Sequence, residues 1–77
     1  MKPIYYKSAC SIFKGLKEGV DIFGVSGYLG IEVDSLSNAI FLKKARSKEE
    51  LERYWELSSE EEFNDYLINL TEHLKGL

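Results

Sequence analysis

The sequence predicts an α+β fold in which a helix is followed by a three-stranded antiparallel meander and two C-terminal helices packed on the sheet. Three observations support this class. Apolar residues recur at helical spacing near the N-terminus, a period of two dominates the middle, and two helix-start patterns precede amphipathic stretches near the C-terminus. We expect a single domain over residues 1–77, because a chain of this size cannot divide its core between two units.

The first element is expected to be a helix that begins at Ser8 and ends near Glu18. Gly19 suits the left-handed position just past a helix end. A longer helix that continues to Phe23 is an alternative, and it would leave only a two-stranded hairpin. The segment PIYY before the helix is expected to be an extended edge. The apolar stripe of the helix consists of Ala9, Ile12, Phe13 and Leu16.

The next three elements are expected to be strands over residues 20–25, 28–34 and 39–45. Each is short and rich in β-branched and aromatic residues, and the turn-forming sequences SG and SLSN separate them. In the second strand, Leu29, Ile31 and Val33 share one face. This alternation is typical of a half-buried antiparallel strand.

Two capping-box patterns predict the last two helices. Ser47 with Glu50 and Ser59 with Glu62 have the spacing at which the serine accepts a hydrogen bond from the third helical amide, while the glutamate returns to the amide of the serine. Gly76 is expected to end the second helix. The apolar stripes are Leu51, Tyr54 and Trp55 in the first helix and Phe63, Tyr66, Leu67, Leu70 and Leu74 in the second.

Composition and motifs argue for a cytoplasmic, non-enzymatic protein without a metal or other cofactor. No apolar run is long enough to cross a bilayer, and the N-terminus, MKPIYYKSAC, lacks the arrangement of a secretory signal, so we expect no membrane partner. The lone Cys10 is expected to act as a small buried hydrophobe, and His73 as a solvated residue near a helix end. No catalytic triad or phosphate-binding loop is evident.

The charge is divided unevenly along the chain. The net charge is −3, but residues 1–48 hold eight Lys/Arg against four Asp/Glu, which gives +4. Residues 49–77 hold two Lys/Arg against nine Asp/Glu, which gives −7. Such asymmetry bears on partners and on electrostatic steering rather than on the fold.

The acidic half is expected to present a negative face to a basic protein partner. The Glu60–Glu62 run is explained by the helix dipole, since carboxylates are favoured at a helix N-terminus. On the last helix, the face opposite the apolar stripe consists of Glu61, Asp65, Ile68 and Glu72. The preceding helix is expected to lie next to it and to add the carboxylates of Glu49, Glu52 and Glu56.

A basic cluster is the alternative functional site, and it would make the chain a small nucleic-acid-binding or regulatory protein. The cluster consists of Lys43, Lys44, Arg46 and Lys48, with Lys14 and Lys17 as further phosphate contacts and Tyr5, Tyr6 or Tyr28 as stacking faces. Lysines at strand ends also serve to protect sheet edges. A third alternative is a self-associating structural domain, such as a homodimer, whose aromatic residues pack between copies.

The segments SKEELERYWEL and SSEEEFNDYLINL complete an acidic chain that resembles small phage-encoded inhibitor proteins, including some anti-CRISPR proteins. The resemblance covers the expected order of elements and the charge rather than a sequence motif. Proteins of this group bind and block nucleic-acid-handling enzymes, some by occupying the positively charged surface meant for DNA. The resemblance therefore implies an inhibitor that docks an acidic helical face on a basic surface of such a partner.

Overall fold

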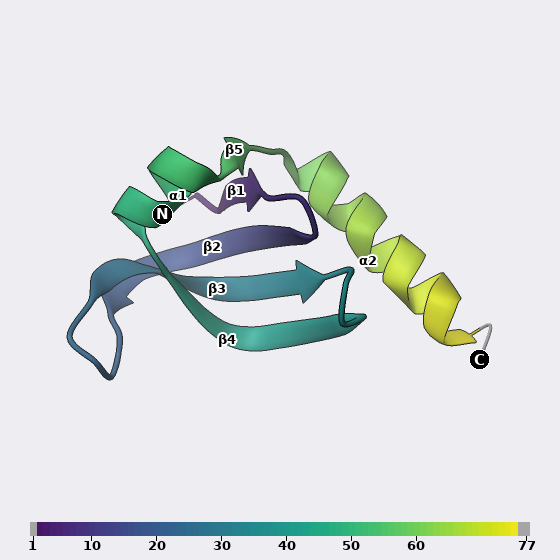
Figure 1. Cartoon of the computed structure of the whole chain (residues 1–77), viewed down its shortest axis with the longest axis horizontal. Helices are drawn as coiled ribbons and strands as arrows, with labels where there is room; N and C mark the ends of the chain where they lie inside the picture. Colours follow the sequence, from purple (N-terminus) through teal and green to yellow (C-terminus); the bar gives the residue numbers. More distant parts are fainter. Residues whose placement is uncertain (1, 76–77) are drawn as a thin grey trace.

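The structure is richer in strands than the sequence predicts. In this computed structural model, which describes residues 2–75, five strands form one antiparallel sheet in the order β4-β3-β2-β1-β5, accompanied by two helices (Figure 1). The predicted order of one helix, three strands and two helices is therefore wrong. The elements are β1 (Ile4–Lys7), β2 (Ser11–Val20), β3 (Ser26–Asp34), β4 (Ala39–Ser47), α1 (Lys48–Tyr54), β5 (Glu56–Leu57) and α2 (Glu60–Lys75).

The segment predicted to be the first helix, residues 8–18, contains most of β2. This strand pairs with β3 along its length and with β1 over its first part. Ile12 and Phe13 are consecutive, so they point to opposite faces of the sheet, yet both are fully buried. Burial on both faces removes the alternation that marks a half-buried strand, and the remaining spacing fits a helix equally well. The alternative of a longer helix to Phe23 is also wrong, because β2 ends at Val20 and residues 21–23 lie in the turn that follows.

The predicted strand over residues 20–25 is the turn between β2 and β3, apart from Val20 at the end of β2. The Asp21 carboxylate accepts hydrogen bonds from the backbone amides of Phe23 and Val25 at 2.8 and 2.9 Å. Gly24 has a φ of 82°, which glycine adopts without strain. These local bonds stabilise a turn where the apolar residues alone indicate a strand.

Other predicted strands agree with the structure. Residues 28–34 and 39–45 lie within β3 and β4. The PIYY segment is extended and enters β1, but β1 is an inner strand because β5 pairs with its outer side. The outer edges of the sheet are β4 and the two-residue β5.

One face of the sheet packs against α2. Phe63 and Leu70 of this helix form a buried cluster with Ile12 of β2 and Val33 of β3. Tyr5, Ile31, Tyr66 and Leu67 pack around the cluster. This face therefore holds the apolar stripe of the last helix, as the period of 3.6 residues predicts.

The opposite face of the sheet packs against α1. Glu32 precedes Val33 in β3, so its side chain leaves the sheet on the side away from α2. Arg46 of β4 binds both Glu32 and Glu50 of α1, and Leu51 of α1 is fully buried. The two helices therefore lie on opposite faces of the sheet, not side by side on one face as predicted.

Both predicted helix starts are confirmed. The Ser47 hydroxyl accepts a hydrogen bond from the amide of Glu50 at 3.1 Å, and the Ser59 hydroxyl accepts one from the amide of Glu62 at 3.2 Å. The predicted return bonds from the glutamates to the serine amides are not formed, because the two carboxylates bind cations instead: Glu50 binds Arg46 at 2.7 Å and Glu62 binds Lys7 at 3.0 Å. The predicted helix end at Gly76 and the predicted packing of Leu74 lie outside the described residues.

Candidate partner-binding site

The outer side of α2 presents a straight stripe of exposed residues, which we name the outer stripe: Glu61, Asp65, Ile68 and Glu72. Spacings of four, three and four residues place them in one line along the helix. The stripe faces away from the sheet because Phe63 and Leu70 hold the other side of α2 in the core. At its centre, Ile68 is 54% exposed.

The carboxylates of the outer stripe have no cation partner among residues 2–73. Within residues 2–73, no basic side chain lies within 4.0 Å of the carboxylates of Glu61, Asp65 and Glu72. Some carboxylates elsewhere do have partners: Glu18 with Lys48 at 3.2 Å, Glu49 with Arg53 at 3.4 Å and Glu62 with Lys7 at 3.0 Å. The stripe is therefore a concentrated negative charge that is available to a partner.

The other predicted acidic residues do not extend the outer stripe. Glu49 and Glu52 are exposed on α1, which lies on the opposite face of the sheet, and Glu56 is in β5 rather than in a helix. Their separation from α2 corrects the expectation of one continuous negative surface formed by two adjacent helices. The sequence shows where each helix is amphipathic, but not which side of the sheet it covers.

Arg46, the centre of the predicted basic cluster, is held inside the α1 face of the sheet. Its Nε and Nη2 atoms donate to the two carboxylate oxygens of Glu32 at 2.8 and 3.0 Å, and its Nη1 atom donates to Glu50 at 2.7 Å. The guanidinium also lies 4.9 Å from the centre of the Trp55 ring. Hydrogen bonding to Glu32 raises the pKa of Arg46, which outweighs the lowering effect of burial. These contacts hold the Arg46 side chain within the fold, so it is not free to contact a phosphate.

The other basic residues are dispersed. Lys48 binds Glu18 and lies 5.3 Å from the centre of the Tyr28 ring, and Lys14 lies between the Tyr5 and Phe63 rings at 5.8 and 5.7 Å. Lys43 and Lys44 stay on the edge strand β4, where Lys44 contacts the Phe41 ring. Of the predicted cluster, Lys43 and Lys44 therefore stay together on β4, whereas Arg46 and Lys48 bind carboxylates.

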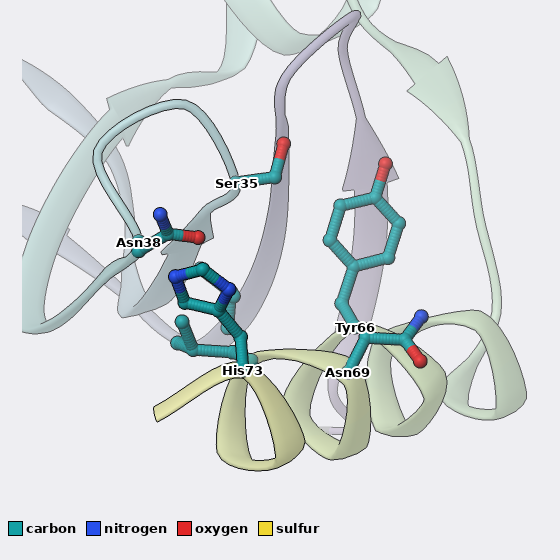
Figure 2. Close-up of a pocket in the computed structure, with 7 residues that line it drawn as sticks. Ser35, Asn38, Tyr66, Asn69 and His73 are labelled. Carbon is teal, nitrogen blue, oxygen red and sulfur yellow. The ribbon is translucent and has the colours of Figure 1, made fainter. Parts of the chain in front are cut away.

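A groove that sequence reasoning missed opens between α2 and the turn joining β3 to β4. It has a volume of about 380 Å³, with Val33 and Leu70 among its lining residues. Figure 2 shows the polar side chains that line it, with the His73 ring beside the Asn38 amide. They are Ser35, Asn38, Tyr66, Asn69 and His73. No sequence signal connects these residues, because turn and helix are about 30 positions apart.

The groove offers hydrogen-bonding groups, including the imidazole of His73 and the hydroxyls of Ser35 and Tyr66. In the described part of the chain, neither a carboxylate nor a lysine lines it, and the Ser35 hydroxyl donates to the backbone oxygen of Cys10 at 2.8 Å. Among residues 2–73, no group of three or more His, Cys, Asp or Glu side chains is placed to hold a metal ion.

Comparisons with known proteins do not identify the chain. No protein-family model, curated protein or solved structure matches it. In the part of the chain that the structure describes, neither helix has the length and apolar character needed to cross a bilayer. The site must therefore be interpreted from its own chemistry.

Proposed function

We propose that this chain is a non-enzymatic, cytoplasmic binding protein that docks the outer stripe of α2 on a basic surface of a protein partner. One observation carries the proposal: three carboxylates that have no cation partner among residues 2–73 flank an exposed isoleucine on a helix whose other side is buried. The carboxylates would steer the encounter, and Ile68 would supply apolar contact at the centre.

The resemblance to small phage-encoded inhibitors suggests a finer proposal, in which the partner is a nucleic-acid-handling enzyme. Such an enzyme carries a basic surface to hold phosphates, and a stripe of carboxylates competes for the same surface. The helix presents its charges in a fixed line, so little conformational entropy is lost on binding. Docking there would block access of the nucleic acid.

The test uses the tagged full chain to capture its partner from the native cell, with nuclease treatment to remove bound nucleic acid and mass spectrometry to identify the protein. The triple reversal E61K/D65K/E72K is expected to abolish capture. The control E49K/E52K/E56K has the same change in net charge, but on residues outside the outer stripe, and it is expected to retain capture. Circular dichroism checks that both variants stay folded.

A substitution at Ile68 distinguishes docking through the outer stripe from simple charge attraction. Ile68→Ser is expected to weaken binding to the captured partner by about tenfold, close to 1.4 kcal/mol, without changing its salt dependence. Equal losses in the two triple variants would show that net charge alone drives capture. Full capture by E61K/D65K/E72K would show that the outer stripe is not the site.

A further inference from the structure

The turn between β2 and β3, which we name the hairpin tip (residues 20–25), exposes apolar side chains that the proposed function does not use. The tip projects from one end of the sheet, away from α2 (Figure 1). Ile22 is 92% exposed and Phe23 83% exposed, and Val20 and Val25 are also exposed. Contiguous exposed apolar residues of this kind mark contacts with a protein or with a membrane.

The hairpin tip is held in shape by its own hydrogen bonds. Besides accepting two backbone amides at its carboxylate, Asp21 donates its amide to the Val25 oxygen at 3.0 Å, and its backbone oxygen accepts the Gly24 amide at 3.0 Å. The one charged side chain of the tip is thus turned toward the backbone. What the tip presents to the outside is apolar.

Lysines lie directly behind the hairpin tip. Lys43 and Lys44 line the same shallow hollow as Ile22 and Phe23, with a volume of about 460 Å³. A neighbouring hollow adds Lys17, beside Leu16 and Leu42. Within residues 2–73 none of these three lysines has a carboxylate partner within 4.0 Å, whereas the nearby Glu18 is neutralised by Lys48.

The long axis of the molecule separates the hairpin tip and its lysines from the negative outer stripe. The principal extent is 40 Å, and α2 lies at the end away from the hairpin tip (Figure 1). Charges separated by more than the Debye length, about 8 Å at physiological salt, are largely screened from each other. The net negative charge of the chain therefore does not prevent the tip from approaching an anionic surface.

We propose that the hairpin tip binds the surface of an anionic lipid bilayer. Ile22 and Phe23 enter the boundary between headgroups and acyl chains, and Lys17, Lys43 and Lys44 contact the anionic headgroups. A bilayer fits better than a protein pocket because the tip projects outward, its exposed side chains are mostly apolar and lysines lie behind them. The sequence-based expectation of no membrane partner rests on the lack of a spanning segment, which a surface contact does not need.

The test is co-sedimentation of the full chain with phosphatidylcholine vesicles, prepared with and without phosphatidylserine. Binding is expected only with phosphatidylserine, and it weakens as salt is raised. I22S/F23S is expected to lose binding. The control L36S/L57S also removes two exposed apolar side chains, but outside the tip, and it is expected to bind normally. K17Q, K43Q and K44Q should each weaken binding about fivefold.

Several results would overturn the proposal. Wild-type protein that stays in the supernatant with phosphatidylserine vesicles would refute it, as would I22S/F23S that binds like wild type. If analytical ultracentrifugation shows a dimer that I22S/F23S dissociates, and vesicles bind no protein, the tip is instead an interface between copies. Both serine variants replace exposed residues, so circular dichroism should show an unchanged fold.

Discussion

Replacing Arg46 with methionine tests how much the fold depends on the ion pair between Arg46 and Glu32. Glu32 is the most buried charged residue that the structure describes. The Glu32 side chain is only 3% exposed, and its two oxygens accept from Nε and Nη2 of Arg46 at 2.8 and 3.0 Å. Arg46 is 22% exposed and has two further neighbours, the Glu50 carboxylate and the Trp55 ring. The pair is therefore asymmetric: Glu32 depends on Arg46 more than Arg46 depends on Glu32.

The asymmetry sets the expected magnitudes. Arg46→Met leaves the Glu32 carboxylate buried without a partner, which costs about 3 to 5 kcal/mol. A chain of this length is expected to be stable by about 4 to 12 kcal/mol, so the variant loses a large share of its stability. Glu32→Met costs less, because Arg46 keeps Glu50 and can reach solvent. The double variant E32M/R46M is expected within about 1 kcal/mol of wild type, since apolar residues can replace a buried ion pair.

Urea unfolding followed by circular dichroism measures these free energies and completes a double-mutant cycle. Circular dichroism is preferable to tryptophan fluorescence because Trp55 touches the mutated side chain. Equal losses in R46M and E32M would contradict the asymmetry. A double variant as unstable as the sum of the two single variants would contradict the assignment of the cost to an unpaired buried charge. If R46M fails to fold, E32M and the double variant still decide both points.

Three further predictions follow from the structure. Burial raises the pKa of Tyr6 above its usual 10.0, and the hydrogen bond to a glutamate raises the pKa of Lys7 above its usual 10.5. The stability that each group contributes is complete below its usual pKa and is lost as pH rises through its higher folded-state pKa. The melting temperature of wild type should therefore fall more steeply above about pH 10 than that of Tyr6→Phe or Lys7→Met. Gly30→Ala places a methyl group on a backbone carbonyl oxygen of β2, and it should cost at least about 3 kcal/mol in urea unfolding, whereas Gly19→Ala meets a leucine methyl at 3.0 Å and should cost about 1 kcal/mol or less. Ser59→Ala removes the cap of α2 and should cost about 1 kcal/mol by the same assay, and a neutral result would show that the cap bond is not stabilising.

Local patterns predicted the elements whose structure depends on a few neighbouring residues. The serine caps at Ser47 and Ser59 locate both helix starts because the hydrogen bond joins residues three positions apart. The alternation of β3 was visible because Ile31 and Val33 face the α2 side of the sheet and Glu32 faces the other. The expectation of a half-buried strand is wrong at this point, because Glu32 is only 2% exposed beneath α1. The outer stripe of α2 followed from helical geometry in the same way.

The elements that failed depend on contacts between distant segments. Residues 8–18 carry the spacing of a helix, and only pairing with β1 and β3, together with a helix on each face, makes them a doubly buried strand. Residues 20–25 carry the apolar content of a strand, but Asp21 closes them into a turn. The spacing of apolar residues within either segment does not predict the observed structure.

By itself, the sequence determined the charge asymmetry, the two helix starts, the strands around residues 28–34 and 39–45, and the polar side of the last helix. These features depend on composition, short-range hydrogen bonds and side-chain period. Only the tertiary structure decided that Arg46 is held by Glu32, that the acidic residues of α1 and α2 lie on opposite faces, and that the hairpin tip lies beside Lys43 and Lys44. The physical reason is that cross-strand pairing and helix placement set which side chains meet, and both are long-range in sequence.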